Sequence, residues 1–503
     1  MAKDKQKQPP TDNKFQAIIS HCKEYGFIFP SSEIYDGLQA VYDYGQMGSE
    51  LKKNIKDYWW KSMTQLADEN IVGIDAAIFM HPTTWKASGH VDNFNDPMID
   101  NKDSKKRYRV DHLIEEYAAA LSAEGKENEA AALLASMETL LAKDDFTGLK
   151  KMIDDNKMQC AVSHTCNWTE IRQFNLMFST EFGTAVSSEE GNNIVYLRPE
   201  TAQGIFVNFL NVQKTGRLKI PFGIAQIGKA FRNEIVARQF VFRMREFEQM
   251  EMQFFVRPGT QKEWYEKWKA KRMQWHESLG MPAAKYRFHD HVKLAHYADA
   301  ACDIEYEFPI GFKELEGIHS RTDFDLQQHQ QYSKKKMQYF DNDLNPETGK
   351  PYGNYIPYVI ETSIGLDRMF LAVISQAYEE QDLSLPAGEA GTEEKKDSRV
   401  VLKLPPVLAP IKLAVLPLTK KDGLPAIAEE IIQACKPHFR CFYEEKDSIG
   451  KRYRRMDALG TPYCVTVDHQ TKEDQTVTIR HRDSMEQERV PIDSLREIVM
   501  AGL

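Results

Sequence analysis

Two arginine-containing motifs that lie far apart in the sequence share one chemical feature. Arg232 lies in the run Phe231-Arg232-Asn233-Glu234, and Arg368 lies in the run Gly365-Leu366-Asp367-Arg368. A guanidinium fork matches phosphate oxygens, and its flat face stacks on an aromatic base. Two such arginines among strand carboxylates suit a nucleoside triphosphate with its metal ions. The sequence therefore predicts a nucleotide site to which both motifs contribute.

The first motif opens a predicted hairpin that runs to Phe255. Period-two geometry places Arg232 and Glu234 on one face of its first strand. The second strand has a polar face with a single aromatic residue, formed by Arg243, Arg245, Phe247, Gln249, Glu251 and Gln253. Its other face is mostly core and carries Met244, Met250, Met252 and Phe254. An exposed ribbon with cross-strand charge pairs is the alternative, but the second arginine motif favours nucleotide binding.

The second motif follows a predicted strand on which Glu361 and Ser363 share a face. Arg368 then lies in the first turn of a helix, where it could reach a triphosphate, and a carboxylate could hold Mg²⁺ through oxygen. By itself the motif is more typical of a strand-to-helix turn with a surface arginine. Glu314 and Glu316 are further candidate metal ligands, although a glutamate in a loop is usually only solvated.

The composition is that of a globular protein with several domains. Single cores stop growing near roughly 250 to 300 residues, so 503 residues predict two or three domains. No apolar run is long enough to span a bilayer, and the polar segment Met1 to Lys14 is neither a secretory signal nor a transit peptide. Seven scattered cysteines give no disulfide framework. We therefore expect a cytoplasmic protein with no membrane segment.

The net charge of -9 argues against a chain coated in positive charge for bulk nucleic-acid binding. Three basic runs remain as candidate local tracks, although a solvated face is the simpler interpretation of each. They are Lys105 to Arg107, Lys334 to Lys336 and Lys451 to Arg455.

The predicted elements describe an α+β unit followed by a smaller α/β unit. Residues from Phe15 to about Met80 predict helix, turn, helix, with Leu51, Ile55, Tyr58, Trp59 and Met63 at helical spacing. Further helices are predicted at Leu113 to Leu149, Lys262 to Leu279 and Met369 to Ala377, and short strands between Ile194 and Phe255. After a linker or exposed loop at Pro386 to Ser398, strands predicted at Ile411 to Leu416, Arg440 to Tyr443 and Tyr463 to Val467 alternate with a helix at Ala426 to Cys435.

Several longer runs, in order along the chain, resemble the bacterial-type homodimeric glycyl-tRNA synthetases, which are class II aminoacyl-tRNA synthetases. Motifs of this length are highly specific, and the resemblance extends from about Phe15 to Val499. The runs are Leu197 to Gly204, Phe231 to Glu234, Arg245 to Glu251, Arg321 to Leu326, and Leu404 to Pro406 with the domain after it.

The resemblance implies a class II antiparallel sheet with flanking helices and a C-terminal α/β anticodon-binding domain. We expect a disordered tail over 1–14, a catalytic domain over 15–385 with a helical insertion at about 92–170, a linker over 386–405 and the anticodon-binding domain over 406–503. The implied reaction is ATP-dependent attachment of glycine to tRNA(Gly) through glycyl-adenylate, with release of AMP and pyrophosphate. The implied assembly is a homodimer.

The resemblance also implies the site residues. Arg232 and Arg368 would be catalytic, with Phe247 and Arg368 sandwiching the adenine ring. The ATP-binding set would be Arg232, Asn233, Glu234, Phe242, Arg243, Met244, Arg245, Glu246, Phe247, Glu314, Leu315, Gly365, Leu366, Asp367 and Arg368. The glycine-binding set would be Arg109, Glu200, Phe247, Glu248, Gln249, Met250, Glu251, Glu361, Thr362, Ser363, Ile364 and Gly365. Glu314 and Glu361 would lie near the Mg²⁺ that accompanies ATP.

The chain departs from the family pattern at two places. Many members carry two Cys-x-x-Cys pairs around the insertion, whereas here Asp100 to Lys105 replaces the first pair and Cys166 remains of the second, near Cys160 and His164. A structural zinc needs about four soft ligands, so we predict none. The segments Tyr35 to Gly37 and Tyr44 to Gly48 also differ from the expected first motif of the class.

Two other functional classes are compatible with parts of the pattern. A non-catalytic synthetase-like protein that binds nucleic acid would be expected to lose the nucleotide arginines or the carboxylates Glu200 and Glu251, all of which remain. A metabolic ATP-dependent ligase would not need the C-terminal α/β domain.

Overall fold

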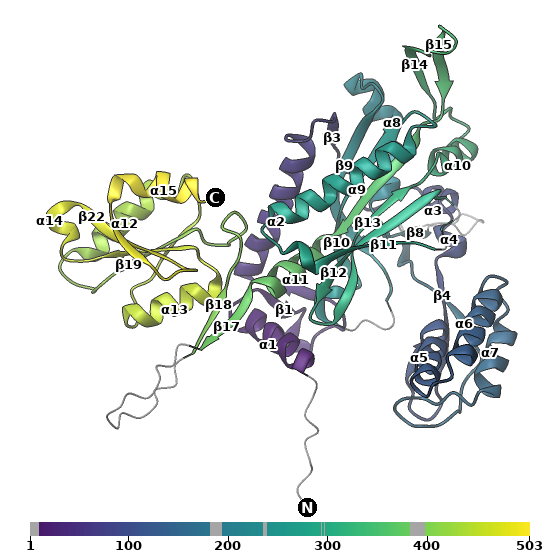
Figure 1. Ribbon diagram of the computed structural model, residues 1–503, viewed down its shortest axis with the longest axis horizontal. Helices are drawn as coiled ribbons and strands as arrows, with labels where there is room; N and C mark the ends of the chain where they lie inside the picture. The colour runs from purple at the N-terminus through teal and green to yellow at the C-terminus, as the bar shows by residue number, and fades with distance from the viewer. Residues whose placement is uncertain (1–9, 182–193, 235–238, 293, 296, 383–397) are drawn as a thin grey trace, which may run out of the picture.

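The computed structural model describes residues 10–181, 194–234, 239–292, 294–295, 297–382 and 398–503. Its centre is a seven-stranded sheet in which all neighbouring strands are antiparallel except β3 and β9, in agreement with the predicted α+β class (Figure 1). The strand order is β11 (Tyr286–Asp290), β12 (Ala300–Phe308), β13 (Gly311–Ser320), β16 (Tyr358–Gly365), β10 (Glu246–Val256), β9 (Phe222–Phe231) and β3 (Ile71–Gly73).

The alternation predicted for the second hairpin strand appears in β10. Met250, Met252 and Phe254 are buried on the face that packs against α9 (Gln261–Ser278), which crosses the sheet in Figure 1. On the other face Phe255 packs under α8 (Ala202–Gly216), while no helix in the described part of the chain covers the polar residues nearer the start of the strand. That uncovered part of the face is where a ligand can reach the sheet.

The predicted hairpin is wrong in one respect, because its polar residues do not all lie on strands. β9 ends at Phe231 and β10 begins at Glu246, and a short 3-10 helix, Phe240–Phe242, lies between them. Gln239 and Phe240 have positive φ angles of 73° and 58°, which an extended strand does not contain. Arg232, Arg243 and Arg245 therefore lie outside the strand regions, where period-two alternation does not determine their direction.

Three helices hold the other end of the sheet. The predicted amphipathic helix is α2 (Gln46–Thr64), which buries Leu51, Ile55, Trp59 and Met63. It packs against α11 (Leu366–Ala377), the helix that follows β16, and α1 (Pro10–Glu24) lies beside them. Residues 10–14 belong to α1, so the tail predicted over 1–14 is wrong for these residues, and 1–9 lie outside the described residues.

The segment that lies between β3 and β9 in the sequence contains a separate small core. It contains the helices expected around Leu113 to Leu149, which appear in Figure 1 at the edge of the molecule. Its elements are β4 (Asn95–Asp100), β5 (Arg107–Arg109), α5 (Val110–Ala123), α6 (Glu127–Leu141), α7 (Phe146–Asp155) and β6 (Arg172–Asn175). Shorter elements around it are α3 (Pro82–Ala87), α4 (His90–Asn93), β7 (Ser179–Glu181) and β8 (Ile194–Tyr196).

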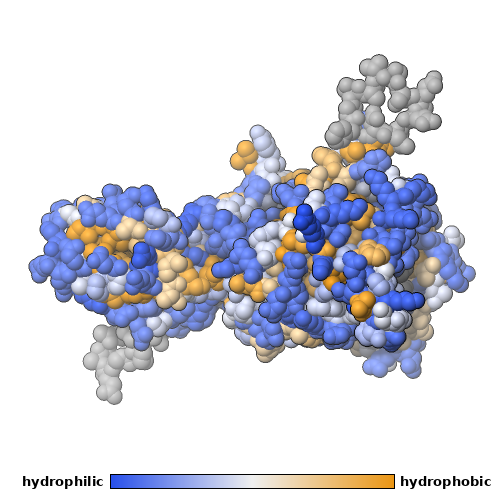
Figure 2. Space-filling view, turned by 90° about the horizontal axis from the view of Figure 1, so that it is seen from above, coloured by the Kyte–Doolittle hydropathy of each residue, from blue (hydrophilic) through white to orange (hydrophobic). Residues whose placement is uncertain are grey.

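The C-terminal residues form a lobe that Figure 2 shows at one end of the molecule. Its five-stranded sheet has the order β20 (Cys441–Tyr443), β19 (Leu413–Pro417), β21 (Tyr463–Val467), β22 (Thr476–His481) and β23 (Gln487–Pro491). Its helices are α12 (Leu424–Cys435), α13 (Ile449–Leu459), α14 (Thr471–Asp474) and α15 (Leu495–Ala501). The expected α/β alternation is present at this end of the chain.

The linker predicted over 386–405 is partly a strand. β18 (Ser398–Leu402) pairs antiparallel with β17 (Tyr378–Asp382). Residues 383–397, between these strands, lie outside the described residues. Leu402 is fully buried, so the hydrophobic core continues through this segment toward the C-terminal lobe.

The remaining elements are β1 (Ile28–Pro30), β2 (Tyr42–Tyr44), α10 (Phe324–Ser333), β14 (Tyr339–Leu344) and β15 (Pro351–Tyr355). None of the helices in the described residues is long and apolar enough to cross a membrane.

Candidate active site

A cavity of about 230 Å³ opens on the uncovered face of the sheet. Its floor consists of two rows of side chains, each formed by residues that pair across β10, β16 and β13. Glu251 lies opposite Ser363, which lies opposite Gly317. In the next row Gln253, Glu361 and His319 are paired in the same way. Because paired residues of antiparallel strands share a face, both rows face the same side, and the first row ends at Gly317, which has no side chain.

A β-bulge decides which glutamate of β13 reaches the cavity. Ile304 pairs with Glu316 and Glu305 pairs with Glu314, so Leu315 has no partner on β12. Leu315 and Glu316 both lie on the core side, where Glu316 is fully buried against Arg272 and His276 of α9. The extra residue turns Glu314 to the cavity side, a common use of bulges beside functional sites. The sequence pattern does not separate Glu314 from Glu316, and the bulge does.

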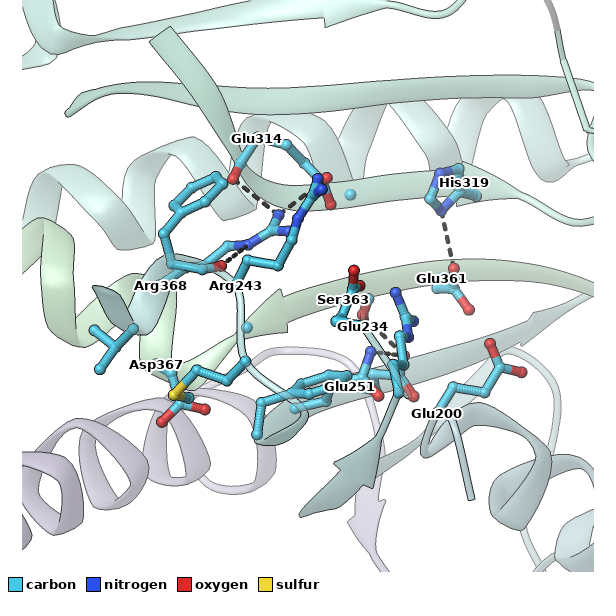
Figure 3. A pocket seen from close by; sticks show the side chains of 18 of the residues that line it. Glu200, Glu234, Arg243, Glu251, Glu314, His319, Glu361, Ser363, Asp367 and Arg368 are labelled. Carbon is cyan, nitrogen blue, oxygen red and sulfur yellow. Dashed lines mark hydrogen bonds and ion pairs between the residues drawn. The ribbon is translucent and has the colours of Figure 1, made fainter. Parts of the chain in front are cut away.

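Three carboxylates at one end of the cavity, of which Glu251 and Glu361 are buried and Glu200 is partly buried, have different partners (Figure 3). Glu361 accepts hydrogen bonds from Gln253 Nε2 (2.7 Å), His319 Nδ1 (2.9 Å) and Arg321 Nη1 (3.1 Å). Burial raises the pKa of Glu361, but the charges of Arg321 and the bond from His319 outweigh it and lower the pKa to about 2. Glu361 is therefore ionised, and both of its oxygens have hydrogen-bond partners within the protein.

Glu200 is the second carboxylate. It lies 3.6 Å from His90 Nε2 and accepts a hydrogen bond from Gln203 Nε2 (3.0 Å). Burial acts to raise the pKa of Glu200, but His90 and the more distant Arg321 lower it well below its usual range. Glu200 is also ionised.

Glu251 is the exception, because neutral groups are its hydrogen-bond partners. Its carboxylate accepts bonds from Ser363 Oγ (2.8 Å), from Thr201 Oγ1 and from Gln249 Nε2 (3.4 Å). No ion pair to Glu251 occurs within the described residues. Burial, followed by the charges of Glu361 and Glu200, raises the pKa of Glu251 to about 8. A ligand with a positive charge would supply the partner that the protein does not.

The opposite end of the cavity is lined by arginines from the loop and from α11. Arg368 Nη1 lies 3.0 Å from Glu314 Oε2 (Figure 3). The Arg368 guanidinium lies 4.5 Å from the centre of the Phe242 ring. Arg232 lies 5.3 Å from the centre of the Phe247 ring. Arginine beside an aromatic face is suited to a nucleobase, and unpaired guanidinium edges are suited to phosphate.

Asp367, next to Arg368, holds the start of α11 in place. Its buried carboxylate accepts bonds from Lys52 Nζ (2.8 Å), from the Glu248 backbone N–H (2.7 Å) and from the Tyr44 hydroxyl. A carboxylate in the first turn of a helix is stabilised by the helix dipole. Asp367 thus ties α11 to α2 and β10 and fixes the point from which Arg368 projects.

The cavity contains most of the residues that the sequence singled out, and it also contains others. The predicted residues that line it are Glu200, Arg232, Glu234, Phe242, Arg243, Met244, Phe247, Gln249, Glu251, Glu314, Glu361, Ser363, Gly365, Asp367 and Arg368. The lining residues not predicted are Val241, Tyr297, Gly317, His319 and Arg321. Arg321 was visible in the run Arg321 to Leu326 as part of the resemblance, but its contact with Glu361 needed the register of β13 and β16.

The other predicted residues lie outside the lining of this cavity. Leu315, Leu366, Met250, Ile364 and Thr362 are buried in the protein interior. Polar members of this set bond elsewhere. Glu248 forms ion pairs with Lys52 (2.7 Å) and Lys56, Arg109 forms ion pairs with Asp111 (2.6 Å) and Asp96, and Glu246 forms one with Lys229. Arg245 donates hydrogen bonds to the Gln39 and Glu234 carbonyls. The Asn233 N–H donates to the Leu176 carbonyl.

The two predicted metal carboxylates differ in their fit to Mg²⁺. Both oxygens of Glu361 already accept hydrogen bonds within the protein, three in all, so Glu361 is less suited to a metal than Glu314. Glu314 is half-exposed and pairs through one oxygen, and one such carboxylate suits Mg²⁺ that arrives with substrate phosphates. Within the described residues no three His, Cys, Asp or Glu side chains are grouped as a metal site.

The cysteines of the insertion lie apart from the cavity. Buried Cys160 accepts bonds from Ser104 Oγ (3.2 Å) and Tyr108 Oη (3.1 Å), while exposed Cys166 bonds to the Lys157 carbonyl. Burial acts to raise the pKa of Cys160, but these hydrogen bonds lower it to about 6. The absence of structural zinc stays a prediction.

Comparisons with known proteins agree with this geometry. Residues 412–501 match the family described as anticodon binding domain, and residues 96–132 and 124–176 match glycyl-tRNA synthetase insertion domain 1. The fold is similar to that of a Giardia lamblia prolyl-tRNA synthetase solved with prolyl-adenylate, with a TM-score of 0.58, 14% identity, and coverage of 98% of this chain and 79% of that one.

Close relatives cover nearly the whole chain. A glycine–tRNA ligase of Chlorobaculum tepidum is 53% identical over 97% of this chain and 99% of its own length. Those of Treponema denticola and Staphylococcus saprophyticus are each 50% identical, over 95% and 96% of this chain and 94% and 98% of their own lengths. With this identity across both the catalytic sheet and the C-terminal lobe, the chain belongs to the glycine–tRNA ligase family.

Proposed function

We propose that the cavity binds glycine and ATP together and joins them as glycyl-adenylate, from which the glycyl group passes to tRNA(Gly). The observation that carries the proposal is the buried Glu251, which has no cationic partner among the described residues and lies beside ionised Glu200 at the acidic end of a cavity lined by arginines at its other end. Glycine supplies an ammonium for the acidic end, and ATP supplies phosphates for the arginines.

The acidic end would select glycine in two ways. Glu251, Glu200 and Ser363 can form charge-assisted hydrogen bonds to the ammonium. The floor beside Glu251 and Ser363 is closely packed, since a Cβ on Gly317 would lie 2.8 Å from His319 Cε1, and this packing would leave little room for the side chain of a larger amino acid. Steric rejection of this kind excludes larger amino acids more strongly than an underfilled pocket excludes smaller ones.

The basic end would hold ATP. Arg232 donates a hydrogen bond to the Pro199 carbonyl, next to Glu200, and lies 5.3 Å from the Phe247 ring centre, so it is the candidate contact to the α-phosphate, with Arg243 available for the triphosphate. Phe247 and Arg368 would enclose the adenine ring, which requires Arg368 to move from its present position over Phe242. Mg²⁺ bound with ATP would be held by Glu314 and would neutralise charge on the phosphates.

In the first step the glycine carboxylate oxygen attacks the α-phosphorus, and the bond from that phosphorus to the pyrophosphate oxygen breaks. The carboxylate is already ionised, so the step needs no general base. The contribution of Arg232 is to orient the α-phosphate and stabilise the charge that develops there. In the second step a ribose hydroxyl of tRNA attacks the glycyl carbonyl carbon, AMP leaves, and the hydroxyl proton passes to the departing phosphate.

Two broader features belong to the same proposal. The loop containing Ile34, Tyr35 and Leu38 exposes these side chains by 86%, 79% and 57%, and a second copy of the chain in a homodimer would cover them. The C-terminal lobe would bind the anticodon of tRNA(Gly), consistent with the family match over residues 412–501. A cytoplasmic location is expected for an enzyme of protein synthesis.

Glycine-dependent exchange of pyrophosphate into ATP tests the proposal. We expect exchange with glycine, and a loss of about 100-fold or more in Arg232→Ala because a positioning charge on the α-phosphate is removed. Lys229→Ala, which removes a surface ion pair with Glu246, is the matched control and should remain within about twofold of the wild type. A folded wild-type protein without exchange would overturn the proposal and favour a non-catalytic, nucleic-acid-binding relative.

A further inference from the structure

The helices α8 and α10 pack against each other and enclose a group of buried polar side chains (Figure 1). Gln203 lies in the first turn of α8, while Asp325 and His329 lie one turn apart on the same side of α10. Their exposed fractions are 0%, 3% and 7%. Gln203 and His329 do not line the candidate active site, so contact with a substrate does not account for these two buried polar residues. Their hydrogen bonds do.

The side-chain amide of Gln203 binds two carboxylates at once. Its Nε2 donates to Glu200 Oε1 (3.0 Å) and to Asp325 Oδ1 (2.9 Å). On its other side, Oε1 lies 2.8 Å from His329 Nε2. Carboxylates only accept hydrogen bonds, so the amide nitrogen must face them and the amide oxygen must face His329.

His329 fixes this orientation of the amide as a neutral donor. Burial lowers the pKa of His329, although the charge of Asp325 acts in the opposite direction. The Gln203 amide oxygen can only accept, so the proton of the neutral ring lies on Nε2. Without this N–H the buried amide oxygen would lose its donor, and a rotated amide would point that oxygen at two carboxylates. Either outcome would weaken the bond that positions Glu200.

A second series of hydrogen bonds leads from Gln203 to another carboxylate of the site. Asp325 accepts two bonds from Arg321, at 2.8 Å from Nε and 3.1 Å from Nη2. Arg321 Nη1 in turn donates to Glu361 Oε2 (3.1 Å). A bidentate pair fixes the plane of a guanidinium, so the position of Asp325 decides where Nη1 points. Gln203 therefore contacts Glu200 directly and reaches Glu361 through Asp325 and Arg321.

We propose that His329 is a positioning residue for glycine, which orients the Gln203 amide and through it fixes Glu200 and Glu361 at the acidic end of the active-site cavity. This inference rests on the proposed function, because it concerns the glycine end of the same site. His329 is not a catalytic residue, since it lines a different cavity, between α3, α8 and α10. The bonds from His329 lead to the acidic carboxylates, so their loss should weaken the binding of glycine and spare that of ATP.

Pyrophosphate exchange by the full-length protein separates the two substrates. We expect His329→Leu to lower kcat/KM for glycine about tenfold, a usual effect of removing one buried hydrogen bond, and to leave the KM for ATP within about twofold. Tyr332→Ala is the matched control, because Tyr332 lies on α10, lines the same cavity as His329 and is 41% exposed. This control should change neither value by more than about twofold.

Two amide variants test the hydrogen bond itself. His329→Gln can place an N–H where Nε2 of the histidine lies, and it should restore kcat/KM for glycine to within about threefold of the wild type. The shorter His329→Asn cannot reach Gln203 in this way and should resemble His329→Leu. The two amides differ by one methylene and are equally polar, so their comparison decides the question even if His329→Leu does not fold.

A double-mutant cycle tests the route through Gln203. Gln203→Met keeps the length of the side chain and removes the amide, so adding His329→Leu to it should lower kcat/KM for glycine by less than about twofold further. Additive losses would overturn the inference, as would equal losses with glycine and ATP, or equal values in His329→Gln and His329→Asn. Failure of the proposed function itself is distinct, since the wild type would then show no exchange.

Discussion

Glycine binding should depend on pH through Glu251. A pKa of about 8 means that most molecules with an empty cavity carry a proton on Glu251 at neutral pH. A protonated carboxyl cannot pair with an ammonium, so glycine must displace the proton when it binds. The ionised fraction of such a group is about 1% at pH 6, about 9% at pH 7 and about 50% at pH 8. The apparent kcat/KM for glycine should therefore rise about tenfold from pH 6 to 7 and about fivefold from pH 7 to 8.

The pH profile of pyrophosphate exchange at saturating ATP measures this effect. Glu361 and Glu200 have lowered pKa values and stay ionised throughout this range, so they add no slope. The kcat/KM for ATP at saturating glycine is the internal control and should vary much less, because bound glycine already holds Glu251 ionised. Proton release on glycine binding, measured in weakly buffered solution near pH 7, should approach one proton per site.

Glu251→Gln provides the decisive comparison. Glutamine keeps the hydrogen bonds to Ser363 and Thr201 but cannot ionise, so the variant should bind glycine more weakly at pH 8 and lose the pH dependence. The raised pKa also has a consequence for folding. The contribution of Glu251 to stability is present at low pH and declines as pH rises through about 8, unless glycine is bound. A flat wild-type profile between pH 6 and 8, or an unchanged slope in Glu251→Gln, would refute the reasoning.

Three further predictions concern the surroundings of the cavity. Gly317→Ala should reduce kcat/KM for glycine by about 10-fold or more in the exchange assay while the KM for ATP changes little, because the new methyl meets the imidazole 2.8 Å away. Glu316→Gln leaves a buried arginine and histidine without their carboxylate, and should lower the free energy of unfolding in urea by about 3 kcal/mol. Asp367→Asn should cost a similar amount, about 3 kcal/mol, because Lys52 loses a charged partner, and should also weaken ATP binding through the displaced start of α11. A melting temperature equal to that of the wild type would contradict either stability prediction.

Local periodicity predicted the parts of the site that lie on regular elements. In β10 the alternation of polar and apolar residues alone predicted that the side chains of Glu251 and Met250 lie on opposite faces of the sheet. The helical spacing of Leu51, Ile55 and Trp59 alone predicted the buried face of α2. The same reasoning failed for Arg243 and Arg245, because the chain leaves extended geometry before β10 begins. Periodicity has predictive value only where backbone geometry is regular.

The sequence by itself therefore determined the α+β class, the family resemblance and the polar face of β10, because side-chain direction on a regular strand or helix follows from the covalent chain. Only the tertiary structure decided which carboxylates are already satisfied. Arg321 and His319 reach Glu361 through the pairing of β13 with β16, whereas Glu251 on the neighbouring strand has neutral partners. Those contacts depend on strand register and on one bulge between segments distant in sequence, which no local pattern specifies.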